Sequence, residues 1–212
     1  MSITIQYWNI TARAVFAQAL AAAGGIEAKL NDTAANLWPT CNANNGISKE
    51  ECPFGQMPVL TVEGKDGVIA ESEAIARYVA TIAGLIPSDP WVAAKSDMVW
   101  ARCFGTWNEL TACQYSADKA AAWEKFGKTT VVEKFAPLEK MLAKSGTTFF
   151  AGDKISASDV VFYTVVQLIL MSNSNSDPLH GFPLLAKNLE ATRATGSLAE
   201  FTSKMAAPYY KV

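Results

Sequence analysis

Strand-like patterns in this chain of 212 residues occur only before the segment GLIPSDP, at residues 84–90. Before that segment, apolar residues alternate between the two-residue spacing of strands and the wider spacing of helices, whereas after it only helical spacing is found. The segment itself is rich in Gly, Pro, Ser and Asp, which are turn residues. The pattern therefore predicts an α/β domain at residues 1–83 and an all-helical domain at residues 90–212.

The α/β domain is predicted to follow the order βαβαββα. Ile3, Ile5 and Tyr7 alternate with polar residues, which is typical of a half-buried strand, and Gly24-Gly25 ends the helix that follows. We expect a strand at 3–7, a helix at 15–23, a strand at 26–30, a broken helix in a mobile loop at 32–52, strands at 59–62 and 68–70, and a helix at 75–82.

The second domain is predicted to contain five helices, at residues 93–114, 121–142, 156–170, 184–194 and 199–205. The start of the third is the best marked, because Ser156 and Asp159 have the spacing of a capping box with Asp in place of the usual Glu. An α/β domain against a helical one can bury the far side of its sheet and leave a cleft between the two.

Composition excludes several classes of function. The net charge is −2 and the pI is near 5.5, so there is no basic surface of the kind that binds nucleic acid. The N-terminus lacks a signal-peptide pattern, and the longest apolar run, residues 160–171, is too short to cross a membrane. The four cysteines show no CxxC spacing and the chain has one histidine, so neither a metal site nor histidine catalysis is expected. We therefore expect a soluble cytoplasmic protein with no metal, no membrane and no nucleic acid as partners.

The segment FGQMPVL, at residues 54–60, places a proline where a strand begins. Pro58 has no backbone N–H and is therefore confined to edge, first or bulge positions of a strand. The residues leave two conformations open. Met57-Pro58 is either an ordinary trans bond at a strand start, or a cis bond that turns the N–H and C=O of Met57 outward for an extended ligand.

Three motifs together, PFGQMPVL at 53–60, ESEAIARY at 71–78 and GDKISASD at 152–159, resemble those of cytosolic glutathione transferases. The resemblance extends over essentially the whole chain and is closest to the sigma class, with mu-like features in YWNI at 7–10. It implies a thioredoxin-like N-terminal domain, an all-helical C-terminal domain that shapes the electrophile pocket, a homodimer, and a cis bond before Pro58.

The resemblance also implies a set of glutathione-binding residues. The backbone of Met57 would pair with the cysteinyl unit, Glu71 with the ammonium group, and Trp38 with the glycyl end. Ser72 would hold the γ-glutamyl carboxylate at a helix N-terminus, where free N–H groups favour an anion; read without the family, it is simply the N-cap. The full set is Tyr7, Trp38, Gln56, Met57, Pro58, Glu71 and Ser72.

Tyr7 matches the catalytic tyrosine of the family, and Arg13 matches a sigma-class arginine that could polarise it. A phenol that donates to the glutathione sulfur favours the thiolate over the thiol. Without the family, Tyr7 is a buried residue at a strand end and Arg13 an exposed residue at a helix start. Ile10, Phe104 and Trp107 are expected to line the electrophile pocket, although the i, i+4, i+7 spacing of Trp100, Phe104 and Trp107 is equally typical of a core or a dimer interface.

The leading hypothesis is a detoxifying or isomerising enzyme that adds the glutathione thiolate to small apolar electrophiles. The resemblance leaves two alternatives open: a prostaglandin D isomerase, and a non-enzymatic module such as the crystallins that use this fold. Tyr7, Pro58 and Ser72 together favour an enzyme.

Overall fold

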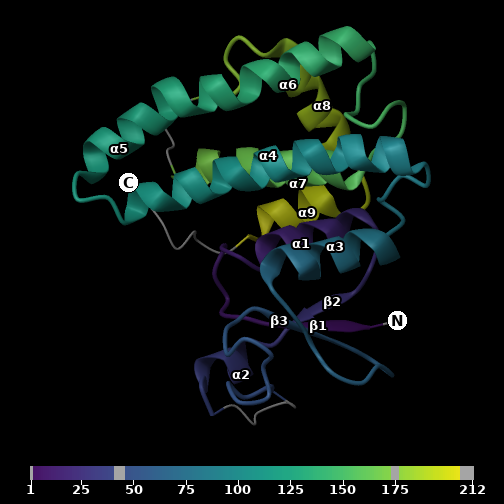
Figure 1. Cartoon of the computed structure of the whole chain (residues 1–212), viewed down its shortest axis with the longest axis vertical. Helices are drawn as coiled ribbons and strands as arrows, with labels where there is room; N and C mark the ends of the chain where they lie inside the picture. The colour runs from purple at the N-terminus through teal and green to yellow at the C-terminus, as the bar shows by residue number, and fades with distance from the viewer. Residues whose placement is uncertain (1, 41–45, 173–176, 206–212) are drawn as a thin grey trace.

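The computed structural model describes residues 2–40, 46–172 and 177–205, and shows a small sheet domain and a larger helical domain stacked along the long axis (Figure 1). Every described strand belongs to the first eighty-two residues, and the described residues from Pro90 onward form only helices and their connections. The predicted division into an α/β part and an all-helical part is confirmed.

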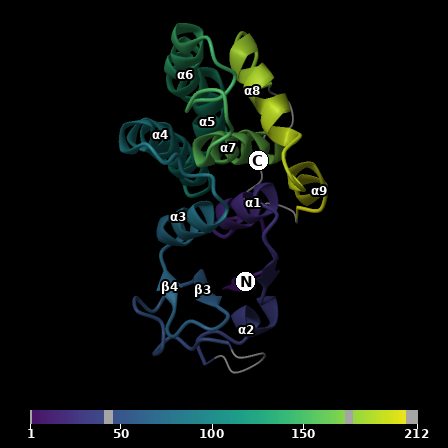
Figure 2. The same cartoon turned by 90° about the vertical axis from the view of Figure 1, so that its right-hand side faces the viewer.

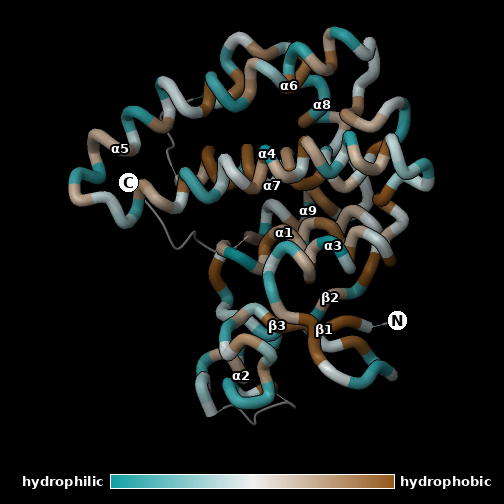
Figure 3. The backbone as a smooth tube through the Cα atoms, in the orientation of Figure 1, coloured by the Kyte–Doolittle hydropathy of each residue, from teal (hydrophilic) through white to brown (hydrophobic). Residues whose placement is uncertain are grey.

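The sheet has four strands in the order β2-β1-β3-β4. β1 (Ile3–Gln6) pairs in parallel with β2 (Ala28–Leu30) and antiparallel with β3 (Val59–Val62), which pairs antiparallel with β4 (Ile69–Ala70). Figure 3 shows hydrophobic residues along β1 and β3, the two central strands. The predicted order βαβαββα is confirmed, because α1 (Val15–Ala23), α2 (Asp32–Asn36) and α3 (Ser72–Ile82) occupy the expected places.

Helices α1 and α3 form a layer between the sheet and the helical domain, and α2 lies on the opposite side of the sheet (Figure 2). The described residues of the second domain form α4 (Pro90–Gln114), α5 (Lys119–Lys125), a π-helix (Phe126–Thr130), α6 (Val131–Ser145), α7 (Ala157–Ser172), α8 (Pro183–Arg193) and α9 (Leu198–Ser203). The helix predicted at 121–142 is therefore one helical run made of three segments, α5, the π-helix and α6.

Helix α6 contains Pro137, which has no N–H to donate to the carbonyl of Glu133 one turn earlier. The structure satisfies that carbonyl from another helix: the guanidinium of Arg102, on α4, donates to the Glu133 oxygen at 2.8 Å and to the Lys134 oxygen at 3.1 Å. The periodicity of the sequence does not reveal this compensation, because Arg102 is 31 residues away in the chain.

Helix α7 is the centre of the helical domain, and nearly all of its residues are buried. Its first turn shows one half of the predicted capping box: Asp159 Oδ2 accepts from the Ser156 N–H at 2.9 Å, whereas the Ser156 hydroxyl donates to the same oxygen at 2.8 Å and the Asp159 N–H donates to the Ser156 carbonyl. Asp159 Oδ1 accepts from the Phe150 N–H at 3.0 Å and from the amide of Asn188 at 2.7 Å. Burial raises the pKa of the Asp159 carboxyl, and these hydrogen bonds offset part of the rise.

The two domains meet through an aromatic contact. Phe16, on α1, has its ring centroid 4.4 Å from that of Phe104 and 5.3 Å from that of Trp107, both on α4. Arg77, on α3, forms an ion pair with Asp97, on α4. Since α1 directly follows the loop after β1, this packing fixes the position of that loop relative to α4. Within the described residues, no helix combines the length and the apolar character needed to cross a membrane.

Candidate functional site

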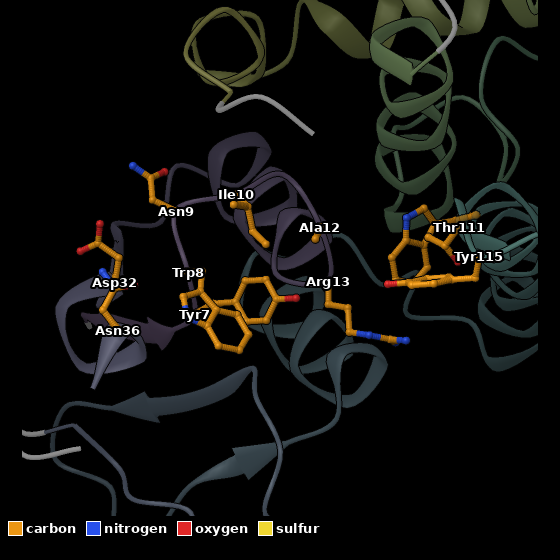
Figure 4. A pocket seen from close by; sticks show the side chains of 11 residues that line it. Tyr7, Trp8, Asn9, Ile10, Ala12, Arg13, Asp32, Asn36, Thr111 and Tyr115 are labelled. Atoms are coloured by element: carbon orange, nitrogen blue, oxygen red, sulfur yellow. The ribbon is translucent and has the colours of Figure 1, made fainter. Parts of the chain in front are cut away.

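Two cavities adjoin at Arg13, which lines both. The smaller has a volume of about 310 Å³ and is formed only by the sheet domain. The larger, about 780 Å³, lies between the sheet domain and the far half of α4 (Figure 4). Their residues differ in kind, since the smaller is mainly polar and the larger mixes aromatic, aliphatic and polar side chains.

The smaller cavity brings together five of the seven residues predicted to bind glutathione. Gln56, Met57 and Pro58 lie on one side of it and Glu71 and Ser72 on another, with Arg13 completing the lining. The Met57-Pro58 bond is cis, as the resemblance implies, and Val59 then begins β3 opposite Gln6. The backbone N–H and C=O of Met57 make no hydrogen bond to the described residues. They are therefore available to an extended ligand.

Helix α3 directs its N-terminus toward this cavity through an unusual residue. Glu71 is the N-cap, with φ 69° and ψ 120°, and it is the only described non-glycine residue with positive φ. This conformation is disfavoured for residues with a Cβ by about 1–3 kcal/mol. Such strain is often found at binding sites. The backbone here places the exposed Glu71 and the buried Ser72 side by side in one cavity.

Ser72 is the first residue of α3 rather than its N-cap, so the simple capping role is not observed. In the described part of the chain, no side chain caps the first turn of this helix. The N–H groups of that turn are therefore not satisfied by a capping side chain, and the positive end of the helix dipole faces the cavity. Backbone donors and the Ser72 hydroxyl together suit a carboxylate.

Gln6 supports the smaller cavity, and the sequence analysis did not identify it. Its side chain is buried at the end of β1, where its amide donates to the Ile47 oxygen at 2.8 Å and accepts from the Ile47 N–H at 2.6 Å. The same amide donates to the Met57 sulfur at 3.6 Å. Gln6 thus ties the segment that precedes Pro58 to the sheet. A buried glutamine in a strand is the signal that could have indicated this role, because buried amides need partners.

Tyr7 directly follows β1 and is 6% exposed. It lines the larger cavity together with Arg13, and both side chains reach into it in Figure 4. The Cζ atom of Arg13 lies 5.3 Å from the centre of the Trp107 ring, which is a cation–π distance. This contact holds the guanidinium near the junction of the two cavities. Arg13 therefore stands where a ligand in the smaller cavity would meet one in the larger, and Tyr7 lies in the wall of the larger cavity.

Two of the three residues predicted to line the electrophile pocket lie in the wall of the larger cavity. Ile10 and Trp107 line it, but Phe104 does not. Phe104 is 2% exposed and packs between Phe16 and Trp100, so the structure places it in the core. Phe16, on α1, also contacts Trp107, so the difference is that Trp107 reaches the cavity wall and Phe104 does not.

Seven further residues line the larger cavity, and the sequence analysis did not propose them: Trp8, Asn9, Ala12, Asp32, Asn36, Thr111 and Tyr115. A signal existed for two of them, because Trp107, Thr111 and Tyr115 recur every four residues along one side of α4. Asp32 and Asn36, on α2, had no such signal, since α2 comes near β1 only through the fold.

Trp38, predicted to contact the glycyl end, lies just after α2 and is half-buried. It lines neither cavity. The Trp38-Pro39 bond is also cis, which was not predicted from the sequence.

Much of the loop predicted at 32–52 is described, but residues 41–45 lie outside the described residues.

Comparisons with known proteins agree with this geometry. The sequence model of the family "Glutathione S-transferase, N-terminal domain" matches residues 3–81, and that of "Glutathione S-transferase, C-terminal domain" matches residues 106–205. The chain is 28% identical to Glutathione S-transferase 1 of Ascaris suum over 202 residues, which cover 91% of this chain and 89% of the relative. It is 26% identical to S-crystallin 4 of Enteroctopus dofleini over 198 residues, covering 87% of both. A solved structure of rat hPGDS in complex with a quinoline superposes with a TM-score of 0.80 over all of both chains at 20% identity, which shows a shared fold.

Proposed function

Because this chain belongs to the glutathione S-transferase family, we propose that it is an enzyme that conjugates the glutathione thiolate to small apolar electrophiles. One observation carries the proposal: a polar cavity with the family's binding motif opens, at Tyr7 and Arg13, into a larger cavity with an aromatic wall. A tripeptide fits the first, and an apolar molecule fits the second.

Glutathione is proposed to bind along the smaller cavity. Its cysteinyl unit pairs with the free backbone of Met57 as a short antiparallel strand. Its γ-glutamyl carboxylate lies at the N-terminus of α3 beside Ser72, and its ammonium group lies near Glu71, which lines the same cavity. Gln56 and Pro58 complete the walls. Trp38 is not assigned a role in this arrangement, since it lies outside the cavity.

Tyr7 is proposed to activate the sulfur. A free cysteinyl thiol has a pKa of about 8.5, so only a few per cent is thiolate at neutral pH. A hydrogen bond from a phenol to the charged sulfur is worth about 1.5 to 3 kcal/mol, or about one to two pKa units. That stabilisation makes the thiolate the major form. Arg13, held on Trp107, places a fixed positive charge on the same side and favours the same ionised state.

The electrophile is proposed to bind in the larger cavity, against Ile10 and Trp107. An apolar molecule there leaves water and presents its electrophilic carbon to the thiolate at the junction of the cavities. Attack forms the carbon–sulfur bond and expels the leaving group with its electron pair, or adds across a polarised double bond. Detoxification is the role that such chemistry serves, and cytoplasm the proposed location.

The S-crystallin relative makes a structural protein the main competing function. The position of Tyr7 at a cavity, and the free backbone at Met57, support the enzyme, because a structural protein needs neither. An isomerase of the prostaglandin D type would use the same thiolate without releasing a conjugate. The likeness to rat hPGDS extends to the fold and does not by itself favour that reaction.

A sigma-class homodimer is proposed from the motifs and from exposed apolar side chains. Phe54 is 65% exposed, and Trp91 and Met98, on α4, are 74% and 56% exposed. Trp91 and Met98 are seven residues apart on α4 and therefore lie on the same side of that helix, and contiguous exposed apolar surface often marks a protein–protein interface. Light scattering at micromolar concentration tests the assembly, and a monomeric mass would contradict it.

The function itself is tested by two measurements on the purified chain. We expect it to bind a glutathione-affinity column, to elute with free glutathione, and to form the conjugate of a chloronitrobenzene. Retention without turnover of any electrophile would support the non-enzymatic alternative. Failure to bind glutathione by calorimetry would reject the proposal altogether.

A further inference from the structure

The larger cavity has opposite charges at its two ends. Arg13 and Asp32 are the charged side chains among its described lining residues. In Figure 4, Arg13 lies on the side of Thr111 and Tyr115, whereas Asp32, Asn36 and Asn9 lie together beyond Tyr7 and Trp8. The apolar surfaces of Ile10 and Trp8 separate the two ends. A ligand that fills this cavity therefore meets a positive group at one end and an acidic, amide-rich group at the other.

The polar groups at the Asp32 end are not engaged elsewhere. Within the described part of the chain, the side chains of Asp32, Asn36 and Asn9 have no hydrogen-bond or ion-pair partner. The N-terminus of α2 does not require them either, because the Asn31 side chain accepts from the Ala34 N–H at 3.1 Å. Asp32 is half-buried, so its carboxylate loses part of its hydration without gaining a protein donor.

We infer that Asp32, with Asn36 and Asn9, makes this enzyme selective for electrophiles that carry a hydrogen-bond donor or a cationic group at the end away from the reacting carbon. This inference rests on the proposed function, since it takes the reacting end to lie at Tyr7 and Arg13. A carboxylate at the distal end would face Asp32 as a like charge. Fatty-acid-like electrophiles are therefore disfavoured relative to amine- or hydroxyl-bearing ones.

The test uses glutathione conjugates, because they occupy both cavities at once and need no catalysis. S-alkyl glutathiones of increasing chain length are prepared in three forms, ending in ammonium, methyl or carboxylate, and their binding is measured by calorimetry. Partly exposed ion pairs contribute about 0.2 to 1 kcal/mol, so at the best chain length the ammonium form should bind about five-fold more tightly than the carboxylate form. The preference should decrease with added salt.

Two variants test whether the preference for the ammonium form comes from the Asp32 carboxylate or from the overall negative charge of the protein. Asp32→Asn should bring the ratio of ammonium to carboxylate affinity close to one and leave the methyl form unchanged, which also reports that the variant is folded. The control is Glu133→Gln, which removes an acidic residue from the first turn of α6, outside both cavities, and should keep the wild-type ratio.

The outcomes are distinct. Equal binding of the three forms to the wild type, or the same ratio in Asp32→Asn as in the wild type, would overturn the selectivity and leave the transferase function standing. Absence of binding by every conjugate, including the methyl form, would instead reject the glutathione site, and the inference with it.

Discussion

The two cavities differ in what builds them. The smaller is formed by three short segments of one domain, around Arg13, around residues 56–58 and at Glu71-Ser72. Backbone conformation shapes this cavity, through the cis bond before Pro58 and the positive φ of Glu71. The larger draws side chains from the loop after β1, from α2 and from α4 across the domain interface.

A site made of backbone geometry and adjacent residues tolerates few changes, whereas a site walled by side chains from separate helices changes with each substitution. Arg13 lines both cavities, and Tyr7 lines the larger one. Glutathione recognition and electrophile recognition should therefore respond to different mutations, and the following predictions test that separation.

The largest effect is expected from disrupting the packing of the helical domain, which supplies one wall of the larger cavity. Asp159→Ala deletes the acceptor of buried donors from Phe150, Ser156 and Asn188. Buried donors without partners cost about 1–3 kcal/mol each, so we expect a loss of about 3–5 kcal/mol in the free energy of unfolding. Denaturant titration measures it. Asp153→Ala, an exposed neighbour in the same loop, should lose almost nothing; equal losses in both variants would show that the buried network is unimportant.

The second-largest effect is expected on catalysis, from a change at Tyr7. Tyr7→Phe removes one hydroxyl, and turnover near neutral pH should fall about ten-fold or more, given about 1.5 to 3 kcal/mol of thiolate stabilisation. The pKa of the bound thiol should rise toward its free value, which the thiolate absorbance reports in a pH titration. Glutathione affinity should change little. Tyr78→Phe, on α3 and away from both cavities, is the control; identical titration curves for wild type and Tyr7→Phe would make Tyr7 structural.

A smaller effect should be confined to the glutathione cavity. Ser72→Ala removes one donor to the carboxylate but keeps the backbone N–H groups of α3, so we expect about a five- to ten-fold weaker affinity for glutathione, from about 1–1.5 kcal/mol. The KM for the electrophile at saturating glutathione should not change. If the dissociation constant for glutathione and the KM for the electrophile rose together, the two sites would not be separate.

The smallest effect should be confined to the electrophile cavity. Ile10→Ala shortens a half-buried side chain that lines the larger cavity. Each buried CH₂ contributes about 0.8 kcal/mol, so the KM for an apolar electrophile should rise about three- to five-fold. Steady-state kinetics should show an unchanged KM for glutathione. If Ile10→Ala weakened glutathione as much as the electrophile, the two cavities would have to be treated as one site.

Much of the fold was predictable because its signals are local. Alternation at Ile3 and Ile5, the glycines after α1, and the Ser156–Asp159 box each act within a few residues. The glutathione motif is local only within each of its segments, residues 56–58 and Glu71-Ser72, and the fold brings these segments together in one cavity. Gln6 was not found, because its partners, Ile47 and Met57, are 41 and 51 residues away.

Local sequence patterns were enough to predict the two-part architecture and the order of elements in the sheet domain. Tertiary packing was needed to show that Trp107 lines the larger cavity whereas Phe104, on the same helix, does not, although both contact Phe16. It also placed Trp38 outside both cavities and Asp32 inside the larger one. The physical reason is that helical periodicity shows which residues share a face, but the part of that face left uncovered depends on the angle and position at which another helix crosses it.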